Sequence, residues 1–198
     1  MNVARQNTTL SSSDTVLMVV DCQDAILRES YQETRTLAQI QLLVETAQVL
    51  TVPIIATVQY PERLGGLTST LAAVCQHLAT AAIPKTTFSA WREPHVQRAL
   101  AGTGRKQIVL CGLETHICIC QTAIDLAVHG FSVHVVADAV TSHTVELHKL
   151  GMERMRDSKV LPCAAETVVY EWLERAGTSE FKDVLAFVKV ARRASLIA

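Results

Sequence analysis

The chain has 198 residues, enough for one domain with a substantial core and too few for two ordinary ones. Lysine and arginine number 18 and aspartate and glutamate 19, so the net charge of −1 gives no electrostatic reason to expect nucleic acid or an anionic membrane as a partner. Apolar residues make up 49% of the chain, yet no uncharged run approaches the ~20 residues that span a bilayer. We expect a small, weakly charged partner, with a sheet covered on both faces and a subunit interface absorbing the apolar excess.

Two features indicate where the protein resides. Residues 1–13 are polar and lack the apolar stretch of a secretory signal, so we expect a disordered or extended tail there and a single domain over 14–198. A weak mitochondrial presequence is the alternative. Six cysteines lie mostly inside apolar runs, as reduced thiols of intracellular proteins do: Cys22, Cys75, Cys111, Cys118, Cys120 and Cys163. We therefore expect a cytoplasmic protein.

Apolar, β-branched runs alternate with helical patterns along the chain. The expected strands cover 15–21, 53–60, 81–83, 106–113, 132–140 and 159–162, and the expected helices cover 34–50, 69–79, 93–101, 115–129, 143–157, 165–175 and 181–194. Continuous apolar character indicates strands buried on both faces, as in a parallel sheet. We predict an α/β fold, a doubly wound, mostly parallel six-stranded sheet of order 3-2-1-4-5-6 with helices on both faces.

Asp21 ends the first expected strand. In an open sheet of this class ligands bind beyond the carboxyl ends of the strands, at the point where the strand order reverses. A carboxylate at that place could act as a general base or orient another group. The alternative is a cap on the following helix, for which Asp24 is better placed because Asp21 is still in strand register.

The stretch 109–130 crowds three cysteines around a strand-to-helix junction. With Thr115 as the expected N-cap, Cys118 occupies the first helical turn, where unpaired N–H groups and the helix dipole favour a thiolate. Cys120 points about 200° away, because each helical residue turns by ~100°, so a redox dithiol is not expected. A nucleophile is the functional interpretation of Cys118, and a buried, apolar-like side chain is the alternative.

A metal site is not expected. Cys118, Cys120 and His116 lack a second pair of ligands at a usable spacing, and the remaining histidines are scattered. The sequence gives no reason to expect any other cofactor either.

Lys85 follows the third expected strand without other charges beside it. It would therefore also reach the carboxyl edge of the sheet. An ammonium beside Asp21 and Cys118 would stabilise both a carboxylate and a thiolate. A solvated lysine at a loop tip is the alternative.

Together these residues resemble the isochorismatase-like cysteine hydrolase superfamily, which includes nicotinamidases, N-carbamoylsarcosine amidases and isochorismatases. The similar segments are MVVDCQDAI (18–26), PKTTFSAW (84–91) and CGLETHICICQTAIDLAVHGFSVHVVADAVTS (111–142). The resemblance runs from about residue 14 to 173. It implies a catalytic triad with Asp21 as proton acceptor and donor, Lys85 as electrostatic partner and Cys118 as nucleophile.

The resemblance also implies an unusual cis peptide between Leu113 and Glu114. That peptide would turn the amides of Glu114 and Cys118 into an oxyanion hole. The expected substrate pocket is lined by Gln23, Tyr60, Phe88 and Trp91, although the three aromatic residues could equally be lid packing.

The resemblance implies a metal-independent cysteine hydrolase that acts on a small amide-like, or related C–N or ether, substrate through a thioacyl intermediate. Nicotinamidases carry an Asp-x-His metal motif after strand 2, where this chain has TVQYPERLGGLTS, so neither the metal nor nicotinamide is carried over. The alternatives are a catalytically quiet scaffold and a nuclease, as some trypanosomatid relatives are labelled. We expect a homo-oligomer, a dimer or tetramer.

Overall fold

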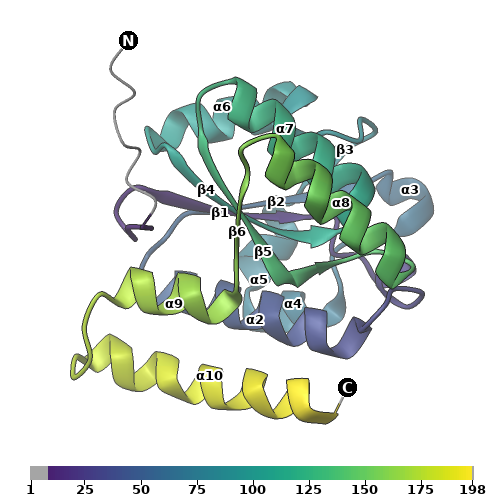
Figure 1. Ribbon diagram of the computed structural model, residues 1–198. Helices are drawn as coiled ribbons and strands as arrows, with labels where there is room; N and C mark the ends of the chain where they lie inside the picture. Colours follow the sequence, from purple (N-terminus) through teal and green to yellow (C-terminus); the bar gives the residue numbers. More distant parts are fainter. Residues whose placement is uncertain (1–8, 198) are drawn as a thin grey trace.

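A six-stranded sheet forms the centre of the computed structural model, which describes residues 9–197 (Figure 1). The strands lie in the order β3-β2-β1-β4-β5-β6. Every neighbouring pair is parallel, so the predicted topology is confirmed. The strands are β1 (Thr15–Val20), β2 (Ile54–Gln59), β3 (Ile83–Lys85), β4 (Gln107–Leu113), β5 (Ser132–Thr141) and β6 (Leu161–Cys163).

Helices cover both faces of the sheet. The chain forms α1 (Asp24–Leu27), α2 (Glu33–Val49), α3 (Pro61–Leu64), α4 (Ser69–Val74), α5 (Gln76–Ala81), a 3-10 turn (Ala90–Arg92), α6 (Pro94–Thr103), a π turn (Thr115–Ile119), α7 (Cys120–Val128), α8 (Val145–Asp157), α9 (Ala165–Leu173) and α10 (Ser179–Ile197). Figure 1 shows α2, α4, α5 and α9 on one side and α6, α7 and α8 on the other, with α10 as an outer layer beside α2. Within residues 9–197 no helix combines the length and apolarity needed to cross a membrane.

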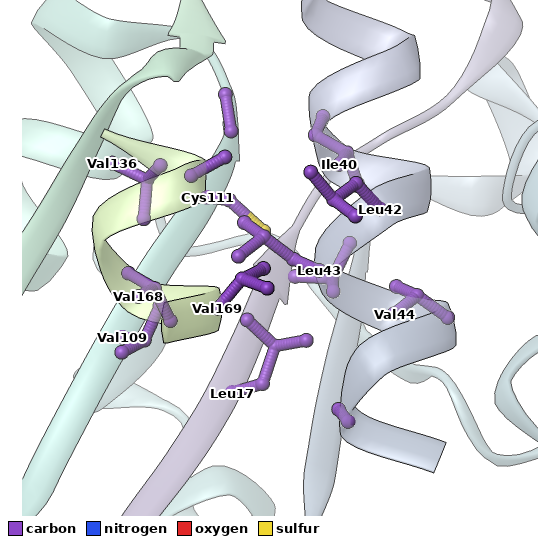
Figure 2. Close-up of a cluster of buried hydrophobic side chains, with 14 of the residues drawn as sticks. Leu17, Ile40, Leu42, Leu43, Val44, Val109, Cys111, Val136, Val168 and Val169 are labelled. Carbon is purple, nitrogen blue, oxygen red and sulfur yellow. The ribbon is translucent and has the colours of Figure 1, made fainter. Parts of the chain in front are cut away.

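Each face of the sheet has its own core. Figure 2 shows the face under α2 and α9, where Leu17 of β1 and Val109 of β4 meet Leu43 and Val169 of the helices. Every residue of β1 is buried, as the continuous apolar run predicts. Burying one such Leu or Val side chain contributes about 1.5–3 kcal/mol, so the central strands form a rigid base for the residues at their ends.

Several boundaries differ from the sequence expectation. The helix expected over 69–79 is broken at Cys75, whose φ of −146° and ψ of 81° are not helical, so α4 and α5 are separate. Leu10 is only 3% exposed and its amide donates to Glu171, so residues 10–13 belong to the domain rather than to a free tail. Residues 1–8 of the expected tail lie outside the described residues.

Candidate active site

Three strand ends supply the charged and thiol groups of the site. Asp21 directly follows β1, Lys85 is the last residue of β3, and Cys118 lies in the helical turn after β4. Lys85 Nζ lies 2.6 Å from Asp21 Oδ2 and 3.7 Å from Cys118 Sγ. The structure therefore brings together the three side chains that the sequence singles out, at the carboxyl edge of the sheet where the topology predicts a site.

These groups are removed from water. The side chains of Asp21 and Lys85 are completely buried, and Cys118 is 6% exposed. A buried ion pair keeps both charges only where the remaining donors and acceptors are also satisfied. An ammonium between a carboxylate and a thiol is thus held in a fixed, low-dielectric position.

The surroundings of Cys118 favour the protonated thiol. Burial raises its pKa to about 12, the negative charge of Asp21 adds to this effect, and the positive charge of Lys85 opposes it. Lys85 stabilises the thiolate, as expected, but desolvation and the neighbouring carboxylate outweigh it, so the pKa of Cys118 is raised overall. Any nucleophilic chemistry needs a base to remove this proton, and Asp21 is the nearby carboxylate.

Two residues of β2 complete the polar shell, and the sequence analysis missed both. Thr57 Oγ1 donates to Asp21 Oδ1 over 2.8 Å, and Lys85 Nζ donates to Gln59 Oε1 over 2.6 Å. Alternate residues of a strand share a face, so polar side chains at positions 57 and 59 of an otherwise apolar run were the available signal.

The backbones of β1 and β4 approach each other closely next to the site. Gly112 has a φ of +120°, and a Cβ there would lie 2.0 Å from the carbonyl oxygen of Val20. Only glycine permits this approach and this backbone conformation. Immediately beyond, Asp21 adopts a left-handed φ of 53°, which turns the chain sharply at the end of β1. The ends of two central strands are thereby drawn together.

The helix after β4 starts one residue earlier than expected. Glu114 is its N-cap, and Thr115 lies inside the π turn, fully buried, with Oγ1 3.0 Å from His148 Nδ1. The assignment of Thr115 as N-cap is therefore wrong, since its hydroxyl bonds to α8 instead. Cys118 still lies in the first turn. The Leu113–Glu114 peptide is cis, in agreement with the resemblance.

Gln23 is occupied by structural hydrogen bonds. Its Nε2 donates to the carbonyl oxygens of Gln59 and Gly65, over 3.0 and 2.6 Å, and its Oε1 accepts from the Gln59 amide over 2.7 Å. Both of its N–H donors are used, and the residue is fully buried. Gln23 thus fixes the end of β2 rather than facing a pocket.

The three predicted aromatic residues separate in the structure. The amide of Tyr60 donates to the carbonyl of Lys85, and the carbonyl of Phe88 accepts from Lys85 Nζ over 3.3 Å, so both border the site. The two residues are 46% and 55% exposed.

Trp91 packs near the C-terminal end of α7. Its ring packs against His129 and Phe131, with centroid separations of 4.7 and 5.6 Å. His129 directly follows the C-terminal end of α7, whereas Cys118 precedes the first residue of that helix. The structure gives Trp91 a packing role there.

The other thiols of the 109–130 stretch are structural. Cys111 is fully buried in β4, and burial raises its pKa. Cys120 is 1% exposed. Burial raises the pKa of its thiol, and the positive charge of Arg154 on α8 partly opposes that effect. All six cysteines are free. In the described part of the chain, no cluster of three His, Cys, Asp or Glu residues could hold a metal ion.

Residues 15–167 match the family model described as the isochorismatase domain. The chain belongs to the isochorismatase family. It is 34% identical over 180 residues to the secreted isochorismatase effector Isc1 of Phytophthora sojae, covering 88% of this chain and 84% of that protein. Isochorismatase domain-containing protein 2 of Danio rerio is 34% identical over 176 residues, covering 88% of this chain and 87% of that protein.

Solved structures share this isochorismatase-family fold. The MAR1 ribonuclease of Caenorhabditis elegans superposes with a TM-score of 0.84 at 26% identity, covering 91% of this chain and 92% of that one. YcaC of Escherichia coli, described as an octameric hydrolase of unknown specificity, superposes with a TM-score of 0.83 at 20% identity, covering 98% and 97%. The family and fold indicate a hydrolase.

Proposed function

We propose that this isochorismatase-family chain is a metal-independent cysteine hydrolase acting on a small amide-like substrate. The observation that carries the proposal is the position of Lys85 Nζ, between the buried carboxylate of Asp21 and the thiol of Cys118. A thiol, a base and a fixed positive charge within hydrogen-bond reach form the arrangement that covalent acyl transfer needs.

In the first half-reaction, Asp21 accepts the thiol proton as Cys118 Sγ attacks the substrate carbonyl carbon. The tetrahedral intermediate collapses when the protonated Asp21 gives that proton to the leaving nitrogen and the C–N bond breaks. A thioester on Cys118 and a free amine or ammonia result. Lys85 stabilises the transient thiolate, because its ammonium lies 3.7 Å from Sγ.

In the second half-reaction, Asp21 removes a proton from water while the water oxygen attacks the thioester carbon. Breaking the C–S bond releases a carboxylic acid, and the proton returns to Cys118 Sγ. The oxyanion formed in each half-reaction is bound by the amides of Glu114 and Cys118. Both amides belong to the first turn after β4, where helix N–H groups lack intrahelical partners.

The surroundings favour a small, uncharged substrate. Cys118 is 6% exposed, so a reactive carbonyl must enter a nearly closed site. A charged substrate would lose its hydration beside an ion pair that is already balanced. Tyr60 and Phe88, both exposed next to Lys85, are the proposed rim contacts.

The test is a screen of small amides and carbamoyl compounds with wild type and Cys118→Ala, with intact-mass detection of the acyl enzyme. We expect turnover and an acyl adduct in wild type only. Equal turnover by both proteins excludes Cys118 as nucleophile.

Cys120→Ala is the matched control, because it removes a buried thiol two residues away and should retain activity. Absence of any activity would favour a scaffold role for the fold. Degradation of RNA that survives Cys118→Ala would favour the activity named for the C. elegans structure, although a net charge of −1 argues against phosphate binding. A cytoplasmic location and a homo-oligomeric state remain part of the proposal and are tested by fractionation and light scattering.

A further inference from the structure

The strand β2 lies between the two strands whose charged residues meet, yet it contributes no charge to the site. In the order β3-β2-β1, Lys85 comes from one neighbour and Asp21 from the other. Neighbouring strands are ~4.8 Å apart, so the lysine side chain must cross β2 to reach the carboxylate. The polar side chains of β2 lie beneath this crossing, one bonded to each partner.

We propose that Gln59 is a positioning residue that holds the Lys85 ammonium in place without neutralising it; this inference rests on the proposed cysteine hydrolase function. Gln59 Oε1 lies 2.6 Å from Lys85 Nζ, as close as the Asp21 carboxylate. A neutral amide oxygen orients an ammonium while leaving its charge available to a nearby thiolate. A second carboxylate at this position would place two negative charges beside the single positive charge of the ammonium and reduce its effect on the thiolate.

The orientation of the Gln59 amide is determined by its neighbours. Its Nε2 donates to the carbonyl oxygen of Thr86 over 3.1 Å. The backbone N–H and C=O of Gln59 are both hydrogen-bonded to the side chain of Gln23. The reversed amide would point an NH₂ group at an ammonium, leaving two donors in contact. The side chain is therefore pre-set as an acceptor toward Lys85.

The hydrogen-bond inventory of Lys85 explains why this anchor matters. An ammonium has three N–H groups. The two shortest contacts of Nζ, both 2.6 Å, are to Asp21 and Gln59. The contact with Asp21 is an ion pair, and the hydrogen bonds other than that to Gln59 are longer: to the carbonyls of Thr87 and Phe88 at 3.0 and 3.3 Å, and to Cys118 Sγ at 3.7 Å.

The short contacts to Asp21 and Gln59 hold the ammonium in place, whereas its longer hydrogen bonds can change partner. When Cys118 loses its proton, the thiolate becomes the stronger acceptor, and an N–H of Lys85 turns from the loop carbonyls to the sulfur. The Gln59 contact need not change during this step. Gln59 thus limits the ammonium to a rotation, whereas an unanchored lysine would stay with the loop carbonyls.

The experiment compares Cys118 alkylation by iodoacetamide in wild type, Gln59→Met and Gln59→Glu across pH 6–10, with kcat and KM for the best amide substrate. We expect Gln59→Glu to slow alkylation about tenfold at each pH, the effect of one unit of thiol pKa. Gln59→Met should lower kcat and alkylation together and leave KM unchanged.

Gln41→Met is the matched control, since the side-chain amide of Gln41 donates to Glu45 of the same helix, α2. In a background carrying both Asp21→Asn and Lys85→Met, substitution of Gln59 should have no further effect on alkylation. A Gln59→Glu protein that alkylates and turns over like wild type overturns the positioning role, as does an undiminished Gln59 effect in the double background.

The alkylation readout does not depend on turnover. If no amide is hydrolysed but the Gln59 variants still change Cys118 reactivity, the proposed function fails and the positioning role stands. If hydrolysis depends on Cys118 but the Gln59 variants change neither alkylation nor turnover, the proposed function stands and the positioning role fails. Should Gln59→Met fail to fold, Gln59→Glu, which keeps the side-chain shape, decides the outcome.

Discussion

The Lys85–Asp21 and Arg192–Glu166 pairs have the same 2.6 Å separation between nitrogen and oxygen but opposite surroundings. Both side chains of the first pair are fully buried, whereas Arg192 and Glu166 are 58% and 35% exposed. Water screens the surface pair and can replace either partner. The buried pair has lost the hydration of two charges and depends on its own contacts. Equal distances therefore have unequal consequences for stability and chemistry.

The largest expected effect is that of Lys85→Met. The substitution leaves the Asp21 carboxylate buried without its counter-ion, so we expect the free energy of unfolding to fall by about 3–5 kcal/mol, together with loss of hydrolysis. Urea unfolding and the amide assay measure the two effects. Adding Asp21→Asn should restore most of the stability and none of the activity. If the double variant is as unstable as Lys85→Met, an uncompensated charge is not the cause.

Thr57→Val comes next, because it removes the hydroxyl that donates to Asp21 Oδ1 and keeps the shape of the side chain. A buried carboxylate oxygen without its donor should cost about 1–3 kcal/mol of unfolding free energy. Thr103→Val is the control, since its hydroxyl donates to a carbonyl of the same helix. If both variants lose the same free energy of unfolding, the hydrogen bond from Thr57 does not specifically stabilise the buried ion pair.

The pH dependence tests the electrostatics at the sulfur. Because the folded Cys118 pKa of about 12 exceeds the ordinary value of 9.0, this thiol favours the folded state at pH below 9, and that contribution is lost as pH rises from 9 to 12. Alkylation of Cys118 should keep accelerating beyond pH 9. A plateau near pH 9 would falsify the raised pKa. Cys118→Ser should weaken the alkaline loss of stability, by comparison of urea midpoints at pH 8 and 10.

The smallest effect is expected for Arg192→Gln. Its guanidinium is exposed and its bonds to Glu166 compete with water, so neither the urea midpoint nor the alkylation of Cys118 should change measurably. The same result is expected for Arg92→Gln, which breaks the surface pair with Asp125. A loss comparable to that of Lys85→Met would contradict the contrast between buried and surface pairs.

The order of the strands and the meeting of Asp21, Lys85 and Cys118 were predictable from the sequence. Buried parallel strands give continuous apolar runs, and their carboxyl ends gather at one edge, so residues directly after such runs become neighbours. The roles of Thr57 and Gln59 were not predictable in this way. Which residue of a neighbouring strand lies under a given side chain depends on register, and the composition of a run does not specify it.

Tertiary packing explains two other differences from the sequence expectation, the raised pKa of Cys118 and the position of the Trp91 ring. From the local sequence, Cys118 at a helix start beside a lysine indicates a thiolate, but complete enclosure of Asp21 and near-complete enclosure of the thiol reverse that balance. Trp91 follows the same strand as Lys85, yet its ring turns to the end of α7, because His129 and Phe131 offer it an apolar and aromatic surface.

By itself the sequence determined the parallel sheet, its helical layers and the meeting of Asp21, Lys85 and Cys118 at one sheet edge, because hydrophobic periodicity and position after a strand are local properties. Only the tertiary structure decided the raised pKa of Cys118, the neutral acceptors around Lys85 and the close approach of the backbone at Gly112. These depend on how much water each group loses and on which atoms of distant strands come within hydrogen-bond distance, and both are set by packing across the whole sheet.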